Sequence, residues 1–315
     1  SNRSTKHIGC QHMKKLITLL LIITTIWSCD NNKASDTGLL TVVTTTGMIA
    51  DIVKNVGKDS VEVTALMGPG VDPHLYKATQ GDLGRLQRAN IIFYNGLHLE
   101  GKMGEVFEKL GRIKTVIPVA RGIDSTFLLD DPIYENAIDP HIWFDLSIWA
   151  STIVEVTSTL IEADPGNAKY YEENAAYHTN ELLKLHEWVK TEIQKIPADK
   201  RILITAHDAF NYFGRAYDIE VRGLQGISTL SEFGLRDRVD LVNFIVERKI
   251  KAVFVETSVS KKNINAIVEG CRQKGHDVII GGSLFSDAMG AEATPEGNYI
   301  GMVMANVKTI VEALR

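Results

Sequence analysis

The chain has 315 residues, of which 44% are hydrophobic, and a formal net charge of −5 at pH 7. This length exceeds the usual size of a single hydrophobic core and predicts two domains. The first 28 residues carry four basic side chains and no acidic one, so the remainder holds 30 basic against 39 acidic residues, a net charge of −9. Such an acidic body argues against a nucleic-acid partner, which requires a basic surface.

The amino-terminal segment has the pattern of an export signal. Lys14 and Lys15 precede an apolar run at 16–26 that is too short to span a membrane comfortably. A small residue before a cysteine at the end of such a run, Ser28-Cys29, is typical of bacterial lipoprotein processing. We therefore expect cleavage before Cys29, lipid attachment to it, and anchoring to a bacterial membrane facing the periplasm or the exterior.

The alternative is an ordinary signal peptide cut elsewhere, which would leave Cys29 as a free thiol. In either case residues 1–29 are interpreted as an extension plus signal peptide. Residues 30–38, which are small and polar, are interpreted as a flexible tether.

Short β-branched runs recur through the rest of the chain and are typical of buried parallel strands. They lie at 40–44, 61–66, 91–94, 115–119, 202–206, 252–256 and 278–280. Amphipathic helical patterns accompany them, for example at 235–248 and 261–274. The pattern predicts two α/β lobes with mainly parallel sheets, at 39–163 and 198–315.

Between the two lobes, residues 164–197 predict one long linking helix. The segment opens with Asp164-Pro165-Gly166-Asn167 and is followed by Pro197, with no other Gly or Pro between them. Its apolar positions step by three, four or seven residues, at Tyr171, Ala175, Leu182, Leu185, Val189, Ile193 and Ile196. A helical linker is stiffer than a loop, so we expect modest closure of the lobes on a ligand.

The tripeptide Asp-Pro-His occurs twice, ending at His74 and His141, and two further candidate donors follow at His207 and Asp287. Asp-Pro alone is explained as a turn, because proline fixes φ and pushes the preceding residue to an extended conformation. It does not explain the histidine that follows both times. Three imidazoles and one carboxylate suit a borderline divalent ion such as zinc or manganese. We therefore predict one metal site.

The predicted strands place these donors at one cleft. His207 directly follows the strand 202–206, and His74 and Asp287 lie just beyond strands, where parallel sheets form ligand clefts. His74 and His141 would come from the first lobe, and His207 and Asp287 from the second. Because neutral imidazole is the form that binds a metal, binding should weaken at acid pH.

Other residues receive lesser expectations. Glu256, at the end of a predicted strand, could accept a hydrogen bond from a ligating histidine. His98 is interpreted as a satisfied loop residue, and His178 and His186 as surface residues of the long helix. Cys271 is interpreted as a small buried apolar residue.

Six motifs together resemble one family, the solute-binding lipoproteins of zinc and manganese ABC transporters, in the group with a rigid inter-domain helix. The resemblance covers 40–315. The motifs are MGPGVDPH at 67–74, NGLHLE at 95–100, DPHIWFD at 139–145, TAHDAF at 205–210, GIST at 226–229 and LFSDAMG at 284–290.

The resemblance implies two α/β lobes joined by one long helix, with a metal buried between them and handed to a membrane permease and its ATPase. The family's ligand positions fall on His74, His141, His207 and Asp287. With His207 as its third histidine, the chain resembles the members of the family that have three histidine ligands and take zinc, manganese or both. The stretch 122–138 lacks the histidines typical of dedicated zinc collectors, so the choice of ion stays open. We expect a monomer and no enzyme activity.

Two alternatives remain at this point. Three histidines and an aspartate could hold zinc with an open position for water in a secreted hydrolase. The chain has no His-Glu-x-x-His pattern or serine elbow to support it. A surface adhesin with a structural metal is the other alternative.

Overall fold

The computed structural model describes residues 38–131, 135–230 and 234–315. Residues 1–39 and 40–315 form separate units, and residues 40–315 make up the folded body. The predicted signal peptide, most of the predicted tether and Cys29 lie outside the described residues. Within the part of the chain that is described, no helix combines the length and the apolar character needed to cross a membrane.

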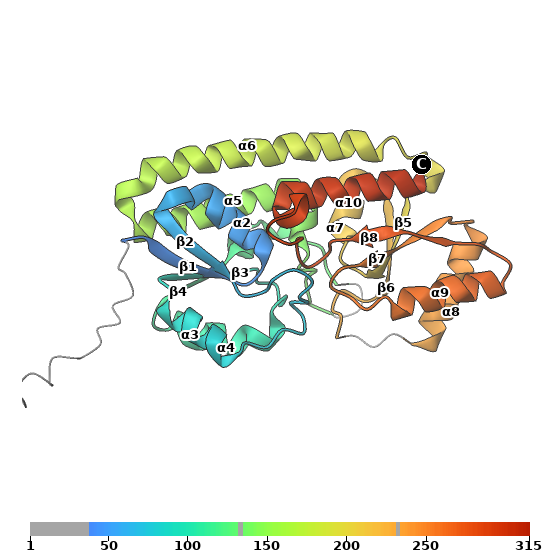
Figure 1. Cartoon of the computed structure of the whole chain (residues 1–315), viewed down its shortest axis with the longest axis horizontal. Helices are drawn as coiled ribbons and strands as arrows, with labels where there is room; N and C mark the ends of the chain where they lie inside the picture. Colours follow the sequence, from blue (N-terminus) through green and yellow to red (C-terminus); the bar gives the residue numbers. More distant parts are fainter. Residues whose placement is uncertain (1–37, 132–134, 231–233) are drawn as a thin grey trace, which may run out of the picture. The chain divides into compact units, whose positions relative to one another are not determined.

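The first lobe is built on a four-stranded parallel sheet with the order β2-β1-β3-β4. Strand β1 lies between β2 and β3, so Val42 pairs with Val63 on one side and with Ile91 on the other. The four predicted runs of this half all form strands: β1 (Leu40–Thr44), β2 (Val61–Ala65), β3 (Ile91–Tyr94) and β4 (Thr115–Pro118). Helices cover both faces of the sheet (Figure 1), namely α2 (Gly47–Gly57), α3 (Gln80–Arg88), α4 (Gly104–Gly111) and α5 (Leu146–Ala163).

The second lobe contains two parallel strand pairs, β5-β6 and β7-β8. The strands are β5 (Ile202–His207), β6 (Glu220–Gln225), β7 (Ala252–Glu256) and β8 (Ile279–Leu284). The helices of this lobe are α7 (Asn211–Tyr217), α8 (Leu235–Glu247), α9 (Lys262–Gln273) and α10 (Tyr299–Leu314). Strand β6 was not predicted, because its Glu-Val-Arg-Gly-Leu-Gln sequence is only partly buried and lacks a continuous apolar run. The expected α/β class with mainly parallel sheets is confirmed.

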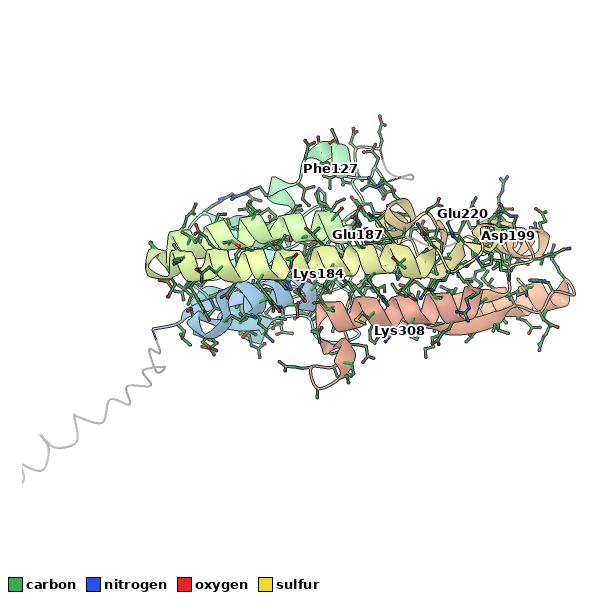
Figure 2. All side chains as sticks on the ribbon, turned by 90° about the horizontal axis from the view of Figure 1, so that it is seen from above. Phe127, Lys184, Glu187, Asp199, Glu220 and Lys308 are labelled. Carbon is green, nitrogen blue, oxygen red and sulfur yellow. The ribbon has the colours of Figure 1, made fainter. Side chains whose placement is uncertain are left out.

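One long helix, α6 (Ala168–Ile193), links the lobes, as expected. It begins four residues later than Asp164, because Pro165–Asn167 form a 3-10 turn first. The Asp164 carboxylate accepts hydrogen bonds from Asn167 and from the Tyr171 hydroxyl, each at 2.7 Å, and so fixes this entry. Figure 2 shows α6 running between α5 on one side and α2 and α10 on the other.

The predicted apolar stripe of α6 is buried along its whole length and joins a core shared by the two lobes. This core contains Trp149 of α5, Leu182 of α6 and Tyr299 of α10, all fully buried. The outward face of α6 carries charged residues such as Lys184 and Glu187 (Figure 2). Moving the lobes apart as rigid bodies would therefore expose core side chains, which opposes a wide opening.

The surface positions expected for His178 and His186 were wrong, since both side chains are buried. His186 Nδ1 lies 2.9 Å from the Tyr217 hydroxyl, and His178 Nε2 lies 4.0 Å from Asp51 Oδ2. Helices α2, α5, α7 and α10 all pack on α6, so its buried face is wider than the apolar stripe alone indicated.

Candidate metal centre

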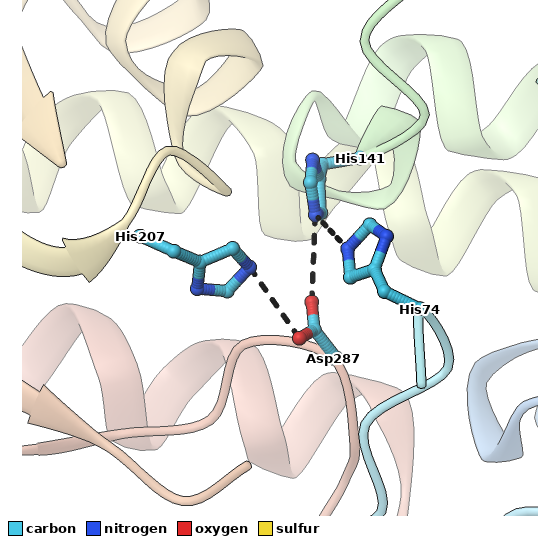
Figure 3. A group of neighbouring side chains, drawn as sticks. All are labelled: His74, His141, His207 and Asp287. Carbon is cyan, nitrogen blue, oxygen red and sulfur yellow. Dashed lines mark hydrogen bonds and ion pairs between the residues drawn. The ribbon is translucent and has the colours of Figure 1, made fainter. Parts of the chain in front are cut away.

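Four side chains from four separate segments converge between the lobes (Figure 3). His74 lies in the loop after β2, His141 directly precedes a 3-10 turn, His207 is the last residue of β5, and Asp287 follows β8. One donor atom from each lies within 4.8 Å of the others. Their exposed fractions are 3% for His74, 2% for Asp287 and 0% for His141 and His207, so the cluster is closed to solvent.

The donor spacings match the edges of a metal coordination polyhedron. The His74 and His141 Nε2 atoms lie 3.3 Å apart. The Asp287 carboxylate reaches two histidines, with Oδ1 at 3.5 Å from His141 Nε2 and Oδ2 at 3.4 Å from His207 Nε2. Tetrahedral nitrogen and oxygen donors at zinc distances stand about 3.3 to 3.6 Å apart. Three donor spacings therefore match the edges of a tetrahedral site, and both Asp287 oxygens take part in them.

Each Asp-Pro-His tripeptide forms a local turn and also supplies a candidate metal ligand. In each copy the aspartate Oδ1 accepts a hydrogen bond from the backbone N–H of the histidine two residues later, at 2.9 Å for His74 and 3.0 Å for His141. The proline between them limits the backbone further. Each tripeptide thus holds its histidine in a preset position on a short loop.

Asp139 also fixes the ring of His141. Its Oδ1 lies 2.7 Å from His141 Nδ1, so this nitrogen carries the hydrogen and Nε2 presents its lone pair to the cluster. Asn211 Nδ2 donates to Asp139 Oδ2 at 3.1 Å, and the Tyr212 hydroxyl donates to its backbone oxygen at 2.8 Å. Sequence reasoning gave Asp139 no role beside the metal, although an aspartate two residues before both histidines was the available signal.

Glu256 takes the corresponding position beside His207. Its Oε1 accepts the backbone N–H groups of Ala206 and His207 at 2.7 and 2.9 Å. Its Oε2 lies 2.5 Å from His207 Nδ1, an ion-pair approach that is not aligned as a hydrogen bond. The structure therefore brings together the residues that were expected to interact.

Burial and neighbouring charges shift the pKa values of the four candidate ligands in different directions. Burial lowers the pKa of His74 to about 3. Burial also acts to lower the pKa of His141 and His207, but the carboxylates of Asp139 and Asp287 for the first, and of Glu256 and Asp287 for the second, outweigh it and raise both. Burial acts to raise the pKa of Asp287, but His207 and His141 hold it well below its usual range. The carboxylates of Asp139, Glu256 and Asp287 thus surround the imidazoles with negative charge, which favours a cation.

Among the described residues, His98, His178, His186, His276 and Cys271 do not join this cluster. His98 is exposed on a loop after β3, and Cys271 is buried in α9 among apolar side chains, as expected. His276 packs near β7, where its Nε2 lies 2.6 Å from the Ile250 backbone oxygen.

Known proteins resemble this chain over almost all of the folded body. The family model described as "Zinc-uptake complex component A periplasmic" matches residues 42–313. "Manganese-binding lipoprotein MntA" of Bacillus subtilis is 49% identical over 277 residues, covering 88% of this chain and 90% of the relative. "Zinc-binding protein TroA" of Treponema pallidum is 48% identical over 273 residues, covering 87% and 88%.

Solved structures agree with these sequence matches. The periplasmic zinc-binding protein TroA from Treponema pallidum has a TM-score of 0.86 to this chain at 48% identity, covering 88% of this chain and 99% of that one. A manganese-bound periplasmic metal-binding protein from candidatus Liberibacter asiaticus has a TM-score of 0.76 at 26% identity, covering 88% and 100%.

Proposed function

We propose the following function for this chain, which belongs to the ZnuA family, the periplasmic component A of zinc-uptake complexes. The protein captures one divalent transition-metal ion outside the cytoplasm and delivers it to an ABC permease, which works with its ATPase. The ion, zinc or manganese, is cargo rather than a resident cofactor. His74, His141, His207 and Asp287 are proposed as its ligands.

One observation carries this proposal, the convergence of three imidazoles and a carboxylate at coordination spacing. The cost of burying Asp287 is offset by the charge of the ion and by the flanking histidines. Asp139 and Glu256 are proposed to orient two of the ligands, which would raise their affinity for the ion.

The choice between the two ions follows from the donor set. Relatives of almost equal identity are named for manganese and for zinc. Three nitrogen donors and one carboxylate favour zinc over manganese, and the general affinity order for divalent ions also places zinc above manganese. We expect both ions to bind and zinc to bind more tightly.

Location and organisation complete the proposal. Relatives with this architecture are named lipoproteins, which supports export and a lipid anchor at Cys29, the latter testable by mass spectrometry of the mature amino terminus. We propose that the protein acts as a monomer. We also propose that it comprises lobes at 39–163 and 198–315 with a linking segment at 164–197 that contains α6.

The family consists of transporter substrate-binding components, not enzymes. A hydrolase would need a coordination position that substrate can reach, whereas the four proposed ligands are at most 3% exposed. Enclosure of this kind favours capture and transfer, so we propose that this chain catalyses no reaction. No described feature favours the adhesin alternative over transport.

The test is metal binding by the purified protein after chelation. We expect one equivalent of zinc or manganese to rebind and to raise the melting temperature by mass action, with zinc displacing manganese in competition. His207→Ala should abolish most of the thermal shift, while the exposed His98→Ala should retain it.

Elemental analysis after native purification identifies the bound ion. The proposal fails if the wild-type protein binds neither zinc nor manganese. It is also overturned if a hydrolase screen of the loaded protein finds robust turnover that depends on His141.

A further inference from the structure

The burial of the four candidate ligands raises the question of how an ion enters and leaves. His141 and His207 are fully buried, and His74 and Asp287 nearly so. The shared core of the two lobes opposes a wide separation. Exchange therefore requires a local opening of one of the loops that carry the ligands.

The loop that carries His141 is held firmly to the second lobe. Trp143 Nε1 donates to the Ser286 backbone oxygen at 3.0 Å, next to Asp287. The Tyr212 hydroxyl and Asn211 Nδ2 hold Asp139, at 2.8 and 3.1 Å. Three buried or half-buried hydrogen bonds must therefore break before this loop can leave the cluster.

The loop 68–79 that carries His74 is held differently. Within the described residues, its side-chain hydrogen bond to the second lobe is made by Asp72, whose Oδ2 accepts from the Thr229 hydroxyl at 2.7 Å. The other oxygen of the same carboxylate accepts the backbone N–H of His74 at 2.9 Å. One carboxylate thus connects a proposed ligand in the first lobe to a hydroxyl in the second.

We propose that the Asp72–Thr229 hydrogen bond is the latch of the metal site, and that Thr229 is a positioning residue that sets the rate at which the ion enters and leaves. The inference rests on the proposed function of metal capture. Thr229 is not one of the four proposed ligands, and its hydroxyl donates to Asp72, so it acts through Asp72 on the His74 loop.

Losing the latch and losing a contact that supports a ligand should change the rates of metal entry and release in different ways. The latch bond does not touch the ion, so its loss should ease opening of the loaded and the empty protein alike. Entry and release should then accelerate together, while the dissociation constant changes less than either rate. A residue that merely supports a ligand would weaken binding through release alone.

The experiment compares Thr229→Val, which removes the hydroxyl at nearly constant volume, with Thr229→Ser, which restores it. Ser228→Ala is the matched control, because the Ser228 hydroxyl makes a local bond to the backbone N–H of Leu230. Release of Zn²⁺ is followed with an excess of a chromogenic chelator. Entry is followed by stopped-flow intrinsic tryptophan fluorescence, to which Trp143 contributes with its ring centroid 5.2 Å from that of His141.

For Thr229→Val we expect both rates to rise about tenfold, as for the loss of a hydrogen bond to a charged group. The dissociation constant should change less than about threefold, and the Co²⁺ absorption spectrum should match that of the wild type. Thr229→Ser and Ser228→Ala should keep wild-type rates. Unchanged rates in Thr229→Val, faster release with unchanged entry, or an altered Co²⁺ spectrum would each overturn the latch.

A second measurement separates this inference from the proposed function. Hydrogen exchange of the metal-free protein should be faster in residues 68–79 of Thr229→Val than in the wild type. Should wild-type protein bind no Zn²⁺, the proposed function fails, and the exchange of this loop still decides whether Thr229 holds it. Identical exchange in the two proteins would reject the latch even where metal binds.

Discussion

Glu256 and His207 are joined through both oxygens of one carboxylate: Oε1 accepts the backbone N–H of His207 at 2.9 Å while Oε2 lies 2.5 Å from its Nδ1. Both residues end strands of the second lobe, β7 and β5. The Glu256 side chain, which is 1% exposed, therefore positions both the carboxyl end of β5 and the imidazole of His207.

The first prediction concerns this carboxylate. Glu256→Gln keeps the shape but removes the charge beside His207, so we expect metal affinity to fall about 10- to 100-fold, as for other groups that orient a ligating histidine. Competitive titration with a zinc chelator measures the change. Glu187→Gln, on the exposed face of α6, is the matched control and should bind as the wild type does. Equal affinity of the two variants would contradict the role given to Glu256.

The second prediction concerns protons. Carboxylates outweigh burial and raise the pKa of His141 and of His207, so the metal-free protein binds protons there more readily than free imidazole does, and an entering ion competes with them. Metal binding should therefore release protons, and affinity should fall as the pH drops. Calorimetric titrations at pH 7 in buffers of different ionisation enthalpy measure the release. A binding enthalpy independent of the buffer would contradict it.

The third prediction concerns His178 in α6. Burial lowers its pKa from 6.5 to about 4, with Lys58 acting in the same direction and Glu181 against it, while the Asp51 carboxylate lies 4.0 Å away. The folded protein then binds fewer protons than the unfolded chain between these values. Above pH 6.5 His178 is neutral in both states and does not lower the free energy of unfolding. As the pH falls from 6.5 towards 4, the unfolded chain takes up a proton that the folded protein does not, so the free energy of unfolding decreases by at most about 3 kcal/mol.

His178→Gln removes this titration. Urea unfolding of metal-free protein across this pH range should show a smaller loss of stability on acidification than in the wild type. The exposed His98→Gln serves as control and should follow the wild-type curve. Parallel curves for His178→Gln and the wild type would show that His178 does not contribute.

The fourth prediction compares two adjacent leucines of α6. Leu182 is fully buried in the shared core, whereas Leu183 is 44% exposed. Leu182→Ala should lower the free energy of unfolding by about 2 to 5 kcal/mol, because it leaves a cavity. Leu183→Ala, the same change one residue on, should cost less than about 1 kcal/mol. Equal losses would mean that the core does not extend through the middle of α6.

Much of the fold could be predicted because its signals are local. The strands of the first lobe are β-branched runs, and the apolar period of α6 is readable over six positions from Tyr171 to Ile193. The candidate ligands could be found because Asp-Pro-His repeats and His207 follows a strand. Strand β6 could not, since Arg222 and Gly223 interrupt its pattern and only part of it is buried.

Other features depend on contacts between distant segments and leave no local trace. The burial of His178 depends on which helices surround α6. Thr229 is an ordinary loop residue until the fold places it against Asp72, 157 positions earlier in the chain. Asp139 is intermediate, since its spacing from His141 was visible but its contact with the imidazole was not.

The shared core also dictates an order of assembly. Helices α2 and α10 are more than two hundred residues apart in the sequence, yet both pack on α6 and belong to one hydrophobic cluster. Contacts so far apart in sequence are slow to form, because a long loop of chain must close before they contribute. A chain still emerging during synthesis or export therefore lacks part of this shared core until α10 has arrived. The four candidate ligands stand at positions 74, 141, 207 and 287, so their cluster cannot form before the segment at Asp287 has been made.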